Sequence, residues 1–152
     1  DFAALCALSE VMQCSIAQLL DFRSEYEGCG VRIPILGTVK GGLGLQAQQE
    51  YEGYEVADVA SPDEYFFLRV TGDSMAPQIQ EGDLALVHSQ QTLQSGQIGV
   101  ILLDDDEATV KRVLFSGKTV ILQPFNNAYT PIVLTTGPCR ILGRVIRTTR
   151  EW

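Results

Sequence analysis

The sequence predicts a mostly β, compact and largely antiparallel domain preceded by two short helices. Three observations support this expectation. Residues 2–22 place apolar side chains at helical spacing, and residues 65–147 contain seven short apolar or alternating runs separated by turn residues. Of the 152 residues, 45% are hydrophobic and 20% are charged, so the chain can bury a core without disulfide bonds or metals.

The expected helices occupy residues 1–24. Apolar residues recur at helical spacing from Leu5 to Met12, and Ser15 followed by Gln18 forms a capping box that opens a second helix. Two helices this short bury little apolar surface on their own. We therefore expect this segment to be the end of a helical domain that begins further upstream.

A polar stretch and then a glycine-rich stretch follow the helices. Residues 25–45 carry Pro34 in an apolar run and end in Lys40-Gly41-Gly42-Leu43-Gly44. Such exposed, flexible segments are preferred sites of proteolysis, so we assign them to a linker and residues 46–152 to the β-rich domain. Residues 50–64 hold six acids and no base, which favours a solvated face over a partner site.

Seven strands are expected after the acidic stretch. Turn signals such as Gly82-Asp83, Ser95-Gly96 and Ser116-Gly117 separate them. This spacing is typical of a compact antiparallel β domain. The predicted strands are residues 65–70, 84–88, 98–103, 108–114, 119–123, 132–134 and 140–147.

Composition excludes several classes of protein. The net charge of −8 argues against a nucleic-acid or anionic-membrane binder, and no apolar run reaches the roughly 18 residues of a spanning helix. The single histidine, His88, excludes a multi-histidine metal site. No cysteine pair has the CxxC spacing of a zinc or redox site, so we expect no metal, no cofactor and a reducing cytoplasm. The cysteines are Cys6, Cys14, Cys29 and Cys139.

The first candidate for chemistry is Ser74. It lies in Gly72-Asp73-Ser74-Met75-Ala76-Pro77, directly after the run 65–70. A glycine before a serine at a strand-to-turn junction exposes the hydroxyl and leaves backbone N–H groups free to form an oxyanion hole. Serines in turns more often cap helices, so this hexapeptide alone does not decide between the two roles.

The second candidate is Lys111. Alternate residues of a strand share a face, so Thr109, Lys111 and Val113 point one way. The lysine either extends its amine into water or lies buried on the core side. Burial disfavours the ammonium form and lowers its pKa from about 10.4, and a neutral lysine takes a proton from a serine as histidine usually does.

Together these motifs resemble the LexA-type self-cleaving repressors, which include lambda-like phage repressors. The Gly72–Pro77 motif and Ala108-Thr109-Val110-Lys111-Arg112 carry the resemblance, with Ser74 and Lys111 separated by 37 positions (111 − 74 = 37). The resemblance covers residues 33–152. The further matching segments are Glu81-Gly82-Asp83-Leu84, Gln123-Pro124 with Asn126, Pro131-Ile132-Val133 and Gly143-x-Val145-Ile146-Arg147.

The resemblance implies a serine endopeptidase that cuts its own chain. Ser74 is then the nucleophile, Lys111 the general base, and the backbone N–H groups of Asp73 and Ser74 hold the oxyanion. The family's scissile bond follows a Pro-apolar-apolar-Gly segment, usually as Ala-Gly or Cys-Gly. Here Gly41-Gly42 occupies that position, and the missing methyl group predicts slow or lost cleavage. Cys29-Gly30 precedes the segment and is misplaced for cleavage.

The resemblance also implies a fragment of a transcriptional repressor of the prophage or SOS type. Residues 1–24 resemble the end of a helix-turn-helix domain, so operator DNA would bind through the missing N-terminal part. Cleavage separates that part from the dimerising part and causes derepression. The regulatory partner is then a RecA filament or an antirepressor protein.

The last strand is expected to form a homodimer interface. Ile141, Val145 and Ile146 supply apolar contact, and a terminal strand has a free backbone edge. Acids, such as Glu151 of the partner copy, would offset the nearby arginines. The other interpretation is an edge strand protected by those arginines.

Two other functions remain open. A signal peptidase also combines a Ser-Met-x-Pro motif with a Ser/Lys dyad, but it needs a membrane anchor. A non-cleaving repressor of the same fold, inactivated by an antirepressor, would account for Gly41-Gly42.

Overall fold

The computed structural model describes residues 30–40, 48–103, 108–135 and 139–151. The chain divides into two compact units, Asp1–Arg32 with Val56–Ala60 and Ile33–Glu55 with Ser61–Trp152. The candidate site lies in the second unit. The two helices expected in residues 1–24 fall outside the described residues, and so does the start of the expected linker.

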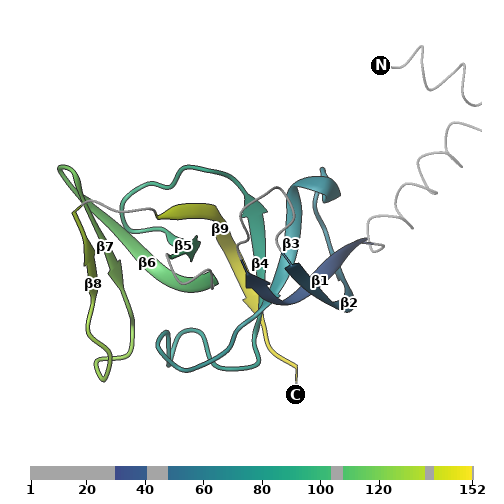
Figure 1. Cartoon of the computed structure of the whole chain (residues 1–152). Helices are drawn as coiled ribbons and strands as arrows, with labels where there is room; N and C mark the ends of the chain where they lie inside the picture. Colours follow the sequence, from purple (N-terminus) through teal and green to yellow (C-terminus); the bar gives the residue numbers. More distant parts are fainter. Residues whose placement is uncertain (1–29, 41–47, 104–107, 136–138, 152) are drawn as a thin grey trace, which may run out of the picture. The chain divides into compact units, whose positions relative to one another are not determined.

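The described residues form nine strands and one short 3-10 helix (Figure 1). Each of the seven predicted runs begins where one of the strands β3 to β9 begins, so the β-rich class is confirmed. The elements are β1 (Val31–Lys40), β2 (Gln48–Ala57), η1 (Pro62–Glu64), β3 (Tyr65–Arg69), β4 (Leu84–Ser89), β5 (Ile98–Leu102), β6 (Ala108–Ser116), β7 (Thr119–Gln123), β8 (Ile132–Leu134) and β9 (Arg140–Thr149).

All nine strands belong to one sheet with the order β2-β1-β3-β4-β9-β5-β6-β7-β8. The meander β5-β6-β7-β8 and the pair β3-β4 are antiparallel, as predicted. The last strand, β9, is antiparallel to both of its neighbours and joins these two halves (Figure 1). The pair β1-β3 is parallel, and it departs from the predicted antiparallel arrangement.

The strand β1 corrects the expectation of an exposed linker. Ile33, Ile35 and Leu36 are buried, and Ile35 and Leu36 are in register with Phe67 and Leu68 of β3. Neither Pro34 nor a glycine at position 37 favours a strand locally. The burial comes from pairing with a distant strand, which local patterns do not reveal.

The strand β9 corrects part of the dimer prediction. Its first half, from Arg140 to Arg144, is paired with β5, and its second half, from Gly143 to Thr149, is paired with β4. Register shifts accompany both pairings, at Val100/Ile101 of β5 and at Leu86/Val87 of β4. Each half of β9 is paired with a neighbouring strand, so its backbone does not offer one continuous free edge for a second copy.

An ion pair ties the segment after β9 to the loop before β4. Asp83 is only 2% exposed, and its carboxylate accepts hydrogen bonds from Arg150 Nε at 2.7 Å and Nη2 at 2.9 Å. The hydrogen bond from Arg150 is the main reason that the pKa of Asp83 is lowered, against the opposing effect of burial. Arg150 is therefore paired with an acid of its own chain, and the expected acid of a partner copy stays a prediction.

The main core cluster draws on strands from both halves of the sheet. Its buried residues come from β1, β3, β4, β5 and β6 and from the loop between β3 and β4. This loop carries Ser74, so the core fixes the loop against the strands. The buried members are Leu36, Leu68, Val70, Met75, Ile79, Ala85, Val87, Val100 and Val110.

Candidate active site

The loop between β3 and β4 presents Ser74. Gly72 has a φ of 79°, a backbone conformation that side chains disfavour, and the turn continues with a hydrogen bond from Ala76 N to Asp73 O at 3.0 Å. Met75 is fully buried beside Ser74 and anchors the turn in the core. This anchoring holds the serine in one place at the start of the turn.

The strand β6 presents Lys111. Its neighbours across the sheet are β5 and β7, so the lysine side chain starts from an interior strand. Lys111 is only 9% exposed, and Val110 and Val113 on the same strand are also buried. The sequence left open whether this amine reaches water, and the structure buries it.

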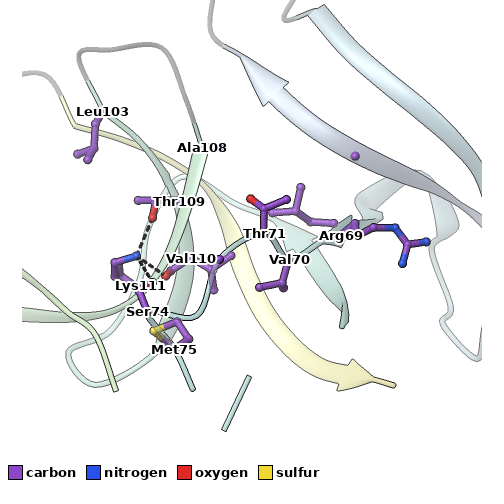
Figure 2. Close-up of a pocket in the computed structure, with 13 residues that line it drawn as sticks. Arg69, Val70, Thr71, Ser74, Met75, Leu103, Ala108, Thr109, Val110 and Lys111 are labelled. Atoms are coloured by element: carbon purple, nitrogen blue, oxygen red, sulfur yellow. Dashed lines mark hydrogen bonds between the residues drawn. The ribbon is translucent and has the colours of Figure 1, made fainter. Parts of the chain in front are cut away.

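Ser74 and Lys111 are brought together (Figure 2). The distance from Lys111 Nζ to Ser74 Oγ is 2.8 Å. The same amine lies 2.8 Å from Thr109 Oγ1 and 3.1 Å from the carbonyl oxygen of Val110. Thr109 was singled out only for sharing a face with the lysine, and that i, i+2 spacing was the signal for its contact.

Burial lowers the pKa of Lys111 from its ordinary value of 10.5. None of the ion pairs found among the described residues involves this amine, and the three oxygens around it carry no formal charge at neutral pH. Among the described residues no acid compensates the ammonium charge, so burial shifts the equilibrium of this amine toward its neutral form.

Lys111 Nζ can donate hydrogen bonds to all three of the oxygens around it. A neutral amine has two N–H donors and one lone pair, whereas an ammonium has three donors and no acceptor. In the neutral form two N–H donors suffice for Thr109 Oγ1 and the Val110 carbonyl, and the lone pair then faces the O–H of Ser74. The arrangement can therefore remove the serine proton.

A cavity of about 310 Å³ opens beside this pair. Gly37 of β1 lines it together with Ser74 and Lys111. Because β1 runs parallel to β3, the chain beyond Gly37 continues in the same direction as the chain that leads from β3 to Ser74. The remaining lining residues are Leu68, Arg69, Val70, Thr71, Gly72, Met75, Leu103, Ala108, Thr109 and Val110.

An ion pair between Arg69 and Glu52 flanks the cavity. Arg69 Nε lies 2.5 Å from Glu52 Oε2 of β2, and Arg69 Nη1 donates to the carbonyl of Gly82 at 3.2 Å. No local pattern predicts this contact, because Glu52 and Arg69 lie on separate strands. It connects β2 to the strand that leads to the serine.

The backbone N–H groups at the serine make no hydrogen bond to another described residue. No described residue accepts a hydrogen bond from the backbone N–H of Asp73, Ser74 or Met75. Free donors beside a nucleophile are what an oxyanion hole needs. The assignment of individual N–H groups to that role stays a prediction.

The other predicted residues have varied positions. Gly41, Gly42 and Cys29 lie outside the described residues. His88 lies on β4, and its ring nitrogens contact Gln90 Oε1 at 2.8 Å and Glu64 Oε2 at 3.4 Å, with no nucleophile.

The proposed dimer residues differ in exposure. Ile141 and Val145 are half-buried, and Val145 packs against the main core cluster. Ile146 is 47% exposed. Of the three, Ile146 is therefore the one with a largely accessible side chain, and its role in a dimer stays a prediction.

Two absences concern only the described part of the chain. Within it, no cluster of three or more histidine, cysteine or carboxylate side chains is arranged to hold a metal ion. Among the same residues, no helix is long and apolar enough to cross a membrane.

Comparisons with known proteins match most of the chain. A model of the Peptidase S24-like family matches residues 34–146. The LexA repressor of Halalkalibacterium halodurans is 42% identical over 117 residues, which are 75% of this chain and 56% of that protein. The LexA repressors of Bacillus mycoides and Bacillus cytotoxicus are 37% identical over 141 residues and 38% identical over 125 residues.

These two alignments cover 90% and 80% of this chain and 68% and 60% of the relatives. The chain thus spans between about half and two thirds of the length of the curated relatives that it matches.

Proposed function

This chain belongs to the LexA-type family with an S24-like peptidase domain, and from that premise we propose that it is the self-cleaving part of a transcriptional repressor. The observation that carries the proposal is the 2.8 Å contact between Lys111 Nζ and Ser74 Oγ beside a cavity. A repressor acts on the chromosome, so the proposal places the protein in the bacterial cytoplasm.

The proposed reaction is hydrolysis of one peptide bond of the same chain. Neutral Lys111 accepts the hydroxyl proton while Ser74 Oγ attacks the carbonyl carbon of Gly41. The tetrahedral intermediate collapses, the C–N bond to Gly42 breaks, and the protonated lysine returns its proton to the leaving amine. Water then hydrolyses the acyl-enzyme with Lys111 as base, which restores Ser74.

The proposed scissile bond is Gly41-Gly42. Gly37 lines the cavity, and four further residues of extended chain reach at most about 14 Å. Support for the assignment is the direction of β1, which heads toward the serine loop as part of the sheet. The segment need not leave an exposed linker to approach the nucleophile, because β1 is already paired with β3.

Repression is proposed to require the whole protein. Operator binding belongs to a part outside the described residues, and two copies joined by the β9 region would hold two such parts together. Cutting at Gly41-Gly42 separates them, and the linked half-site binders become independent and weak. A prophage or SOS setting, with a RecA filament or an antirepressor as the partner, is part of the same proposal.

The experiment is incubation of the chain at pH 7, 8, 9 and 10, followed by intact mass spectrometry. Two fragments, residues 1–41 and 42–152, are expected. Ser74→Ala and Lys111→Ala are expected to stay whole, and cleavage persisting in Ser74→Ala would indicate a contaminating protease. Fragments that end at Cys29 would overturn the assigned bond.

A non-cleaving repressor is the second candidate, because Gly-Gly replaces the family's usual Ala-Gly or Cys-Gly. In that case the chain stays intact at every pH, and Gly41→Ala restores cleavage. A signal peptidase is less well supported, since it leaves the 34–42 segment without a role.

A further inference from the structure

The carbonyl groups on either side of the candidate nucleophile are both held by one residue, Asn126. Its side-chain Nδ2 donates to the carbonyl of Asp73 at 3.1 Å, and its backbone N–H donates to the carbonyl of Ser74 at 3.0 Å. Asn126 lies in the turn between β7 and β8, far from Ser74 along the chain. Two consecutive peptide units of the serine loop are thus both tied to Asn126, and the Asp73 carbonyl also accepts the N–H of Ala76 within its own turn.

Asn126 is itself fixed by its own turn. Its Oδ1 accepts the N–H of Ala128 at 3.0 Å, which sets which end of the amide faces Asp73. Its carbonyl accepts the N–H of Tyr129 at 3.1 Å. Pro124 is buried just before it, and Phe125 packs against the main core cluster.

Because peptide units are planar, the contacts of the two carbonyls also determine where the free N–H groups point. In a trans peptide the C=O and N–H bonds point to opposite sides. Because both carbonyls face Asn126, the N–H groups of Ser74 and Met75 face away from it. Ser74 and Met75 line the cavity, whereas Asn126 does not, so these donors are turned toward the cavity side.

We propose that Asn126 is a positioning residue that orients the Ser74 and Met75 N–H groups as the oxyanion hole, with Met75 in the role that the family resemblance gave to Asp73. The inference rests on the proposed function, because an oxyanion forms only if Ser74 attacks a carbonyl. Tyr129 assists by donating its O–H to Asp73 Oδ1, which fixes the side chain of the residue before the nucleophile. Asn126 touches no reacting atom and acts through the backbone alone.

The expected effect lies in the chemical step. Removing an oxyanion donor outright lowers turnover about 10²- to 10³-fold, and a small misplacement costs up to about 10²-fold. Asn126→Ala removes the side-chain donor to the Asp73 carbonyl and keeps the backbone donor to the Ser74 carbonyl, so the Ser74 N–H group is the one left without its alignment, and we expect self-cleavage to slow by about 10- to 100-fold. The pH at which the rate reaches half of its plateau should not move, because Lys111 keeps its surroundings.

The test measures self-cleavage rates from pH 7 to 10 for the wild type, Asn126→Ala, Asn126→Asp and Asn127→Ala. Asn126→Asp keeps the acceptor for Ala128 but loses the donor to Asp73, so it should also slow cleavage. Asn127 is the exposed neighbour with the same side chain, and Asn127→Ala should cleave within about twofold of the wild type.

A second measurement separates alignment from general loosening of the fold. The probe is the tripeptide boronic acid Val-Lys-boroglycine, which matches residues 39–41 and forms a tetrahedral adduct on a serine. Asn126→Ala should bind it at least tenfold more weakly than the wild type, while the pH midpoint of cleavage and the melting temperature stay unchanged.

The outcomes separate the two proposals. A wild-type chain that neither cleaves nor forms the Ser74 adduct would refute the proposed function. An active wild type with Asn126→Ala or Asn126→Asp cleaving within twofold of it would overturn the role of Asn126. Equal boronate affinity in Asn126→Ala, or a shifted pH midpoint at an unchanged plateau, would overturn it too.

Discussion

Replacing Lys111 with methionine is expected to stabilise the protein at neutral pH while removing its chemistry. Lys111 is 9% exposed and contacts no acid in the part of the chain that the structure describes, so the folded state carries the penalty of a buried amine. Methionine has a similar unbranched shape and fills the same space. Functional residues that are unfavourable for folding are a common source of such trade-offs.

The magnitude follows from two opposing effects. Exchanging buried charged groups for apolar ones of similar volume stabilises proteins by up to about 4 kcal/mol, and the lost hydrogen bonds subtract about 1 kcal/mol or more. We therefore expect a gain of about 1–2 kcal/mol in the free energy of unfolding at pH 7.

The stability gained by Lys111→Met should shrink as the pH rises. Because the pKa of Lys111 is lower in the folded than in the unfolded chain, the unfolded chain binds more protons between the two values. The stability of the lysine-containing protein therefore rises with pH up to about 10.5, by at most about 1.4 kcal/mol per pH unit. The advantage of methionine shrinks over the same range.

The assay is urea denaturation from pH 6.5 to 10 of Ser74→Ala with and without Lys111→Met. The Ser74→Ala background prevents self-cleavage during the measurement. A stability difference that stays constant across this range would mean that the lysine does not titrate there, and it would refute the assignment of a neutral base.

Three further predictions concern other parts of the chain. The pKa of Asp83 is lowered in the folded chain, so this carboxylate contributes stability above its unfolded pKa of 3.8, and that stability is lost as the pH falls through the folded pKa. Urea denaturation should therefore show that Arg150→Gln weakens the fold at pH 7 and that its difference from the wild type disappears at low pH. Gly41→Ala should speed self-cleavage about two- to fivefold, measured by gel densitometry, because alanine needs less ordering than glycine; an unchanged rate would exclude that cause. Sedimentation at micromolar concentration should show a dimer that Ile146→Glu converts to monomer, and a wild-type monomer would reject the β9 interface.

Local patterns predicted the strands whose own residues alternate or form an apolar run between turns. The runs from β3 to β9 alternate or are continuously apolar between turn residues, and their starts were confirmed. The strand β1 was not predicted because the polar and glycine-rich stretches around it indicated a linker, and its burial depends on parallel pairing with β3. The strand β2 was missed because its acids indicated only a solvated face, and Tyr51 and Tyr54 on it are indeed exposed.

The candidate site was predicted in part for a similar reason. The motifs around Ser74 and Lys111 led to the expectation that the two side chains would meet, and the structure has that contact. The contacts of Asn126 with the serine loop were not predicted, because they depend on how the turn after β7 docks on the loop after β3. The interior position of β9 likewise depends on pairings on both of its sides.

The most direct test of the central claim is the rate of self-cleavage as a function of pH, measured by intact mass spectrometry on the wild type and on Lys111→Ala. If a neutral Lys111 activates Ser74, the rate rises with pH and levels off once the pH passes the lowered pKa of the lysine, and Lys111→Ala shows no cleavage at any pH. A rate that does not change with pH, or a Lys111→Ala variant that cleaves as fast as the wild type, would contradict the account.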